Sequence, residues 1–191
     1  PALTTVNRTD FIIADGATIN APLLASVNES TLNITPGRTF NAPNIANIDR
    51  TRVLVSGGSS YSLPLVTSYN SVYYWGYLGD YEMFTADGAG SSLSLANMTT
   101  LTSITNTSNT DDIIRFDRIN GTINLNSLAT INNNTNGNSY TQFNIAANQT
   151  QSLPNLTTGT RLYFTMAAGS SVSLPQLVTA PGWLNFELAT N

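Results

Sequence analysis

A short pattern with a fixed spacing returns along the whole chain. Its clearest mark is proline: Pro22, Pro43 and Pro64 stand 21 residues apart, and so do Pro154 and Pro175. A constant period of this length is typical of solenoids, in which each repeat is one structural unit stacked on its neighbours. The chain is therefore expected to build its core by stacking, and its 191 residues are enough for one domain.

The other positions of the repeat predict a strand, a turn and a second strand. Apolar residues alternate with polar ones, as in a strand with one buried face. Six residues before each proline, or before its counterparts Ser94 and Asn126, stands a residue that tolerates a positive φ. These turn residues are Gly16, Gly37, Gly58, Gly88, Asn120, Asn148 and Gly169. The apolar pairs of the preceding strand are Phe11 and Ile13, Leu32 and Ile34, Val53 and Val55, Met83 and Thr85, Ile114 and Phe116, Phe143 and Ile145, and Phe164 and Met166. Proline lacks an N–H, so it is expected at a strand start or a bend.

These positions predict an all-β fold. We expect a right-handed parallel β-helix of about seven coils, with a short corner after the proline, as a single β-solenoid domain over residues 1–191. Leu184 to Leu188 have the pattern of the first strand of an eighth coil. An uncapped strand exposes an edge, so the chain is expected to be excised from a longer protein with flanking repeats.

The composition excludes several classes of function. The chain has no Cys, His or Lys, so thiol chemistry, Cys or His zinc sites and a Ser-His-Asp triad are excluded. A net charge of −4 argues against a nucleic acid partner, which needs a basic surface. The sequence lacks the long apolar run of a membrane span. A charged fraction of only 9%, with many Asn, Thr and Ser, is typical of secreted or cell-surface bacterial proteins.

The Leu-Pro-x-Leu units, which are LPLV, LPNL and LPQL here, carry a family resemblance. With the turn and the alternating strand they resemble the degenerate repeats of large bacterial extracellular and surface proteins that form right-handed parallel β-helices. They are similar, less fully, to the leucine-rich β-helices of receptor L-domains. The resemblance covers nearly the whole chain. It implies a scaffold whose members include adhesins and polysaccharide-active enzymes, and hence an extracellular glycan as partner.

Three consecutive repeats are longer than the others. The spacing is 30 residues from Pro64 to Ser94, 32 from Ser94 to Asn126 and 28 from Asn126 to Pro154, which adds 9, 11 and 7 residues to the basic repeat. Since the strand positions keep their offsets, the insertions are expected in one corner of the coil, where they form three long loops on one face. Insertions of this kind often make the binding face of a solenoid.

The first insertion is the most aromatic segment of the chain. Its rings belong to Tyr69, Tyr73, Tyr74, Trp75, Tyr77 and Tyr81, and Asp80 lies among them. Aromatic faces stack on sugar rings and carboxylates accept hydrogen bonds from hydroxyls, so this segment predicts a carbohydrate-binding surface. The alternative is a lid that buries its own rings against the solenoid.

The second insertion ends at Asp111 and Asp112, followed by Arg115, Asp117 and Arg118. The two adjacent carboxylates are a weak candidate Ca²⁺ site, because Ca²⁺ prefers oxygen ligands. The alternative is a solvated turn with a surface Arg–Asp pair. The third insertion is rich in Asn and predicts a turn cluster.

We therefore expect a non-catalytic module that binds polysaccharide through residues about 69–82 and 105–118. The predicted ligand-binding residues are Tyr73, Tyr74, Trp75, Tyr77, Asp80, Tyr81, Asp111 and Asp112. No cofactor is expected beyond the Ca²⁺ candidate. Two alternatives stay open: a structural stalk repeat of an adhesin, and a fragment of a polysaccharide lyase or glycoside hydrolase. Glycoside hydrolysis needs two carboxylates at a fixed distance, and the sequence shows no such pair at stacked repeat positions.

Overall fold

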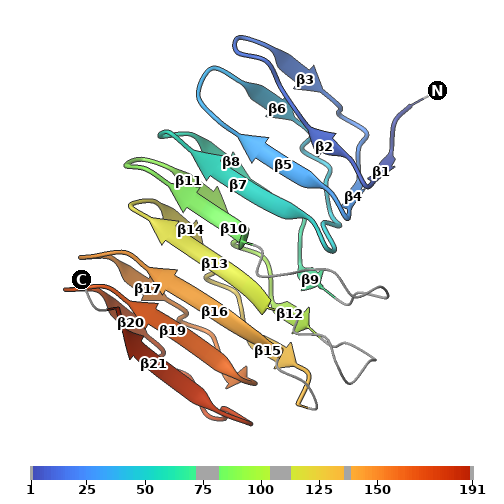
Figure 1. Cartoon of the computed structure of the whole chain (residues 1–191). Coiled ribbons are helices and arrows are strands. Elements are labelled where there is room, and N and C mark those ends of the chain that lie inside the picture. Colours follow the sequence, from blue (N-terminus) through green and yellow to red (C-terminus); the bar gives the residue numbers. More distant parts are fainter. Residues whose placement is uncertain (1, 72–81, 104–112, 136–138, 190–191) are drawn as a thin grey trace.

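The chain folds as stacked parallel strands. The computed structural model describes residues 2–71, 82–103, 113–135 and 139–189. These residues contain strands and no helix, and every pairing between named strands is parallel. The strands lie in stacked sheets, as in a β-helix-like solenoid (Figure 1). The prediction of an all-β, parallel, solenoid-like fold is confirmed to this extent.

One sheet runs the full length of the molecule. It has eight strands, and Figure 1 shows it descending from the N-terminal to the C-terminal end. In order, its strands are β2 (Asp10–Phe11), β5 (Thr31–Ile34), β7 (Arg52–Ser56), β10 (Glu82–Asp87), β13 (Ile113–Ile119), β16 (Tyr140–Ile145), β19 (Leu162–Met166) and β21 (Leu184–Leu188).

Two further groups of short strands complete the stack. The second strand group follows the glycine turn and contains β3 (Thr18–Asn20), β6 (Thr39–Asn41), β8 (Ser60–Ser62), β11 (Ser92–Ser94), β14 (Thr122–Asn124), β17 (Thr150–Ser152) and β20 (Ser171–Ser173). The third strand group follows the proline and contains β1 (Thr5–Asn7), β4 (Ser26–Asn28), β9 (Ser68–Asn70), β12 (Thr100–Ser103), β15 (Thr130–Asn133) and β18 (Thr158–Gly159). The sequence predicted two strands and a short corner, so this third group is an addition.

The core contains a column of stacked phenylalanines along the eight-stranded sheet. Phe84, Phe116, Phe143 and Phe164 are all buried, and consecutive ring centroids lie 4.8, 4.9 and 5.1 Å apart. These distances follow from the spacing of about 4.8 Å between paired strands, since in-register pairing places equivalent side chains above one another. The column continues to Phe186, which is 50% exposed, at 5.2 Å.

The repeated glycine and proline each make a turn, as the sequence predicted. At the first turn, the N–H of Ala17 donates to the carbonyl oxygen of Ala14 at 3.0 Å, and Gly16 between them has a φ of 75°. A positive φ at the third turn residue favours Gly or Asn, and Asn148 adopts 60° at the equivalent position. Pro64 occupies the second residue of another turn, closed from the N–H of Val66 to the carbonyl of Leu63 at 3.2 Å. The proline therefore marks a bend.

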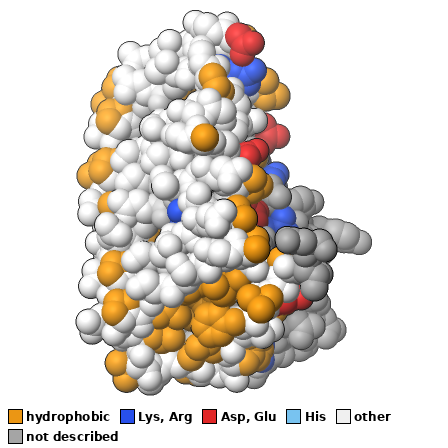
Figure 2. All heavy atoms as spheres, turned by 90° about the vertical axis from the view of Figure 1, so that its left-hand side faces the viewer, with side chains coloured by type: hydrophobic (Ala, Val, Ile, Leu, Met, Phe, Trp, Pro, Cys, Tyr) orange, Lys and Arg blue, Asp and Glu red, His pale blue; other side chains and the backbone are white. Residues whose placement is uncertain are grey.

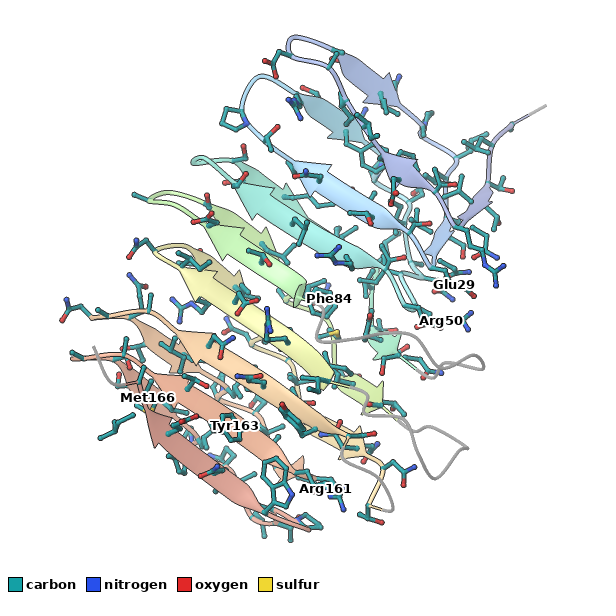
Figure 3. All side chains as sticks on the ribbon, viewed as in Figure 1. Glu29, Arg50, Phe84, Arg161, Tyr163 and Met166 are labelled. Carbon is teal, nitrogen blue, oxygen red and sulfur yellow. The ribbon has the colours of Figure 1, made fainter. Side chains whose placement is uncertain are left out.

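A third corner also needs a positive φ, and the sequence did not reveal it. The residues there are Arg8, Glu29, Arg50 and Arg161, with φ between 49° and 58°. The first three stack on consecutive repeats as an ion-paired ladder. The carboxylate of Glu29 lies 2.7 Å from Arg8 Nε and 2.7 Å from Arg50 Nη2, and Figure 3 shows Glu29 beside Arg50.

The strand pairing corrects the predicted register of the fourth repeat. Ser94 pairs with Ser62, so the counterpart of Pro64 is Ala96 and the turn residue is Gly90, not Gly88. The inward pair of this repeat is Phe84 with Ala86, not Met83 with Thr85. Ser94 and Ala96 both lie in a Ser-Leu alternation, which made a two-residue shift invisible to the periodic pattern. The first two insertions accordingly add 11 and 9 residues.

The fifth repeat buries its predicted inward pair, Ile114 and Phe116, and adds a buried arginine at a position that is apolar in the neighbouring repeats. Phe116 pairs with Phe84, and the second inward position is Arg118, which pairs with Ala86 and is 6% exposed. Its guanidinium donates to the carbonyl oxygens of Gly121 and Thr150 and to Oε1 of Gln149. Burial lowers the pKa of the Arg118 guanidinium, because desolvation disfavours the charged form. Arg118 is therefore not part of a solvated turn.

The C-terminal end exposes apolar side chains. Figure 2 shows hydrophobic groups gathered in the lower part of the molecule, where β20 and β21 lie. Val178 is 81% exposed and Leu188 is 77% exposed. Val178 stands at an outward position equivalent to Thr157. Leu188 stands at the inward position that Ile145 and Met166 hold on the preceding strands, and Ile145 is covered by Met166 of the next strand.

Replacing Phe116 with alanine should destabilise the fold by about 3–5 kcal/mol, because it removes a fully buried ring from the middle of the column. Urea unfolding measures this change. Ile12→Ala is the control, since Ile12 is 89% exposed and the expected change is within about 0.5 kcal/mol. Equal effects of the two substitutions would contradict the description of the core.

Replacing Arg118 with methionine should cost about 2–3 kcal/mol of stability, because it leaves buried carbonyl oxygens without their donor. The same substitution at Arg38, whose partner Asp15 is largely exposed, should cost at most about 1 kcal/mol. Thermal and urea unfolding compare the two variants. An Arg118→Met protein as stable as the parent chain would show that those carbonyls find other donors.

Candidate functional site

Three aromatic side chains meet on the outward face of the eight-stranded sheet. Alternation along β16 and β19 sends Phe143 and Phe164 into the core, and Tyr140 and Tyr163 toward solvent. Trp183, just before β21, joins them. The centroids of Tyr140 and Tyr163 are 5.8 Å apart, and Trp183 lies 5.6 Å from Tyr140 and 6.1 Å from Tyr163. We call these three residues the aromatic cluster.

The aromatic cluster lines an open hollow of about 680 Å³. Polar side chains complete its walls, namely those of Gln142, Arg161, Asn185 and Glu187. Figure 3 shows Arg161 and Tyr163 at the lower end of the sheet. Arg161 donates from Nη2 to the carbonyl oxygen of Thr135, which ties the hollow to the segment after β15. Flat apolar faces and convergent polar groups are the usual components of a ligand-binding surface.

A row of hydrogen-bonded polar side chains extends from the hollow across the sheet. Gln142 Nε2 donates to Asn144 Oδ1 at 2.8 Å and to Thr165 Oγ1 at 3.1 Å. Asn144 Nδ2 donates to Asp117 Oδ1 at 2.6 Å, and Arg115 Nε contacts Asp117 Oδ2 at 3.1 Å. This polar row joins β13, β16 and β19.

The ion pair within the polar row was an alternative that the sequence left open. Arg115 and Asp117 do pair, but they lie on β13 and the side chain of Asp117 is only 6% exposed. The pair therefore belongs to a strand and not to a solvated turn.

Tyr163 and Glu187 form a charge-assisted hydrogen bond in the hollow. The Tyr163 hydroxyl donates to Glu187 Oε2. This hydrogen bond, with smaller contributions from desolvation and from the Glu187 charge, raises the pKa of Tyr163 above its usual value. The neutral, donating hydroxyl is thereby favoured. Glu187 fixes the edge of the Tyr163 ring that faces the hollow.

The strands that flank the insertions place all three at one corner. Each insertion follows a strand of the third group, β9, β12 or β15, and precedes β10, β13 or β16 of the eight-stranded sheet. The flanking strands are neighbours in both groups. The predicted insertion corner thus lies at the edge of the sheet where β10, β13 and β16 begin. Because Tyr140 is the first residue of β16, the aromatic cluster lies next to the third insertion.

The predicted ligand-binding residues lie outside the described residues. These are Tyr73, Tyr74, Trp75, Tyr77, Asp80, Tyr81, Asp111 and Asp112. Tyr69, which the sequence grouped with the first insertion, is corrected: it belongs to β9, is fully buried, and packs edge-on against Phe84 at 4.9 Å. The described part of the chain holds no group of three or more acidic side chains suited to a metal ion.

The aromatic cluster was missed in the sequence because its members do not form a continuous motif. Tyr163 lies between two inward residues, Leu162 and Phe164, and Trp183 belongs to the segment that predicted the start of another coil. Aligning the outward positions of successive repeats would have found it, since the pairing of Leu162 with Leu184 places Arg161 and Trp183 side by side.

Asp117 and Glu187, two acidic residues of this face, lie far apart. Asp117, Asn144, Thr165 and Glu187 occupy equivalent positions on four consecutive strands. At about 4.8 Å per strand, Asp117 and Glu187 are separated by about 14 Å. Glycoside hydrolases place their paired carboxyl groups about 5–9.5 Å apart. This pair therefore lacks the geometry of that reaction.

No protein-family model, curated protein or solved structure matches the chain. Among the described residues, no helix has the length and apolar character needed to cross a membrane.

Replacing Glu187 with glutamine should lower the pKa of Tyr163 toward 10.0, because the substitution removes both the charged acceptor and its repulsion of the phenolate. NMR titration of isotope-labelled tyrosine rings measures this pKa. Glu29→Gln removes an acid at the opposite end of the solenoid and should leave it unchanged. A Tyr163 pKa unaffected by Glu187→Gln would contradict the contact.

Proposed function

We propose that this chain is a non-catalytic extracellular module that binds polysaccharide on the outward face of its eight-stranded sheet. The observation that carries the proposal is the aromatic cluster, in which Tyr140, Tyr163 and Trp183 meet at 5.6–6.1 Å around an open hollow. Three large rings on an outward sheet surface cost solubility unless they contact a partner.

The chemistry of the hollow suits a sugar. The C–H faces of pyranose rings are apolar and pack against aromatic faces, while their hydroxyls need donors and acceptors at the ring edges. The amides of Gln142 and Asn185 can both donate and accept hydrogen bonds. Arg161 can donate them and Glu187 can accept them. Hydrogen-bond donors and acceptors thus surround the aromatic stacking surface.

The position of the insertion corner also favours this face of the sheet as the binding surface. The insertions carry the sequence-predicted ligand residues, and the strands on either side of them lead into β10, β13 and β16. In this proposal Trp75 and its neighbouring tyrosines extend the stacking surface, and Asp80, Asp111 and Asp112 add acceptors. The proposal includes Ca²⁺ held by the adjacent carboxylates of Asp111 and Asp112.

The scaffold proposed for this module is a right-handed parallel β-helix of about seven coils. Right-handed crossovers between parallel strands of one sheet are favoured by the intrinsic twist of strands, in about 98% of cases. Exposed Phe186 and Leu188 on β21 suit a further coil stacked on that edge, as in a larger surface protein. The low charge and the richness in Asn, Thr and Ser support an extracellular, bacterial setting.

A structural stalk of an adhesin is the second candidate, and the uncharged ladders between repeats favour it. Asn41 Nδ2 donates to Asn20 Oδ1 at 2.9 Å, and the hydroxyls of Thr150 and Ser171 lie 2.7 Å apart. These bonds join strands one repeat apart and need no ligand. A chain that serves only as a spacer requires such ladders and has no use for the aromatic cluster.

Replacing Trp183 with alanine should weaken polysaccharide binding by about 30-fold, the effect of losing about 2 kcal/mol at an aromatic contact. Affinity electrophoresis against a panel of soluble plant, bacterial and fungal polysaccharides identifies a bound polymer, and titration calorimetry measures the loss. Leu54→Ala, on the same face at β7, is the control and should keep full affinity.

If the parent chain binds none of the polymers, the structural stalk of an adhesin becomes the favoured function. Binding that survives Trp183→Ala unchanged would instead remove the aromatic cluster from the site.

A further inference from the structure

The polar row has one direction, and that direction is along the solenoid axis. Three residues of the polar row, Asp117, Asn144 and Thr165, pair in register on β13, β16 and β19, and Glu187 of the hollow continues the same position on β21. A polar residue thus occupies this outward position on each of these four strands. Along a single strand the outward chemistry changes instead, from the ring of Tyr140 to the amide of Gln142.

The period of this row is set by the backbone. Paired strands lie about 4.8 Å apart, and a pyranose unit in an extended chain advances by about the same length. Successive sugars lying across the strands therefore meet an equivalent polar position at each step. A chain lying along one strand meets a polar residue only once before the glycine turn.

The side chains of the row keep hydrogen-bonding capacity beyond their mutual contacts. Asn144 uses one amide hydrogen on Asp117, and Gln142 uses its nitrogen on Asn144 and Thr165. The second amide hydrogen of Asn144, Oε1 of Gln142 and the Thr165 hydroxyl hydrogen are suited to hydroxyl groups. Gln142, Asn144 and Thr165 are all partly exposed.

The formal charges of the hollow and the row balance. Arg115 and Arg161 are offset by Asp117 and Glu187 among the described residues. Recognition of a polyanion needs an excess of positive charge along its path. The balance favours a neutral chain.

From these observations, and resting on the proposed function, we infer the ligand class and its path. The site takes a linear, extended, neutral polysaccharide that stacks one end of its bound stretch on the aromatic cluster and crosses β21, β19, β16 and β13 toward Asp117. Its hydroxyls bond to Glu187, Thr165 and Asn144 on successive strands, and the buried Asp117 orients Asn144 through their hydrogen bond.

The test compares short and long neutral ligands on matched variants. Cello-oligosaccharides and manno-oligosaccharides, each as the disaccharide and the hexasaccharide, are titrated against the parent chain, Asn144→Leu and Asn33→Leu. Asn33 occupies the same outward position as Asn144 but lies on β5, so it is the matched control. Polygalacturonate is the anionic comparison. Circular dichroism and urea unfolding confirm that each variant is folded.

We expect Asn144→Leu to weaken hexasaccharide binding by about five- to tenfold, the effect of losing about one hydrogen-bonding group, and to leave disaccharide binding unchanged. Asn33→Leu should alter neither affinity, and polygalacturonate should bind more weakly than the neutral series.

Equal disaccharide and hexasaccharide affinities, or an Asn144→Leu variant that keeps full hexasaccharide affinity, would overturn the axial path while leaving sugar binding at the aromatic cluster intact. Preferential binding of polygalacturonate would overturn the neutral ligand class. Failure of the parent chain to bind any glycan would overturn the proposed function itself, and so is a separate result.

Discussion

In-register parallel pairing is the interaction on which the whole structure depends. Each coil leaves its backbone N–H and C=O groups unpaired until the next coil supplies partners, and burial of unpaired groups is costly. Once paired, every side chain sits above its counterpart at about 4.8 Å. The stacked phenylalanines, the Glu29 ion pairs and the polar row are three results of this one constraint. The core is therefore built from the same few inward positions of every coil, stacked along the solenoid.

The same stacking generates the candidate site. A position that faces outward in one coil also faces outward in the next. Outward side chains of successive strands therefore lie side by side, and they can form a binding surface without a loop. Tyr140, Tyr163 and Trp183 come together in this way, from three consecutive levels of the sheet. A rigid strand holds each ring or its neighbour, and a preorganised surface loses little conformational entropy on binding. The insertions add to a surface that the strands have already built.

Period and turn chemistry were enough to predict an all-β, parallel, solenoid-like fold from the sequence, because glycine, asparagine and proline each serve one geometric purpose. Three features could not be predicted from the sequence: the register of the fourth repeat, the burial of Arg118 and the aromatic cluster. The Ser-Leu alternation around Ser94 fits two registers, and only pairing with Ser62 selects one. Arg118 is buried because carbonyls of the following turn and coil surround it, which depends on tertiary structure. The aromatic cluster depends on which residues align across neighbouring strands, and local composition does not show this alignment.

The third corner has a consequence for how such a chain changes over time. Where it is short, a single left-handed residue such as Arg50 or Arg161 closes it, and where it is long, seven or more residues are added while pairing on both sides is retained. Loop closure entropy grows only slowly with length, so this corner accepts new sequence at small thermodynamic cost. Diversity can therefore accumulate at one vertex while the repeat stays intact, and foreign peptides grafted after Arg50 or Arg161 would be displayed from a preserved scaffold.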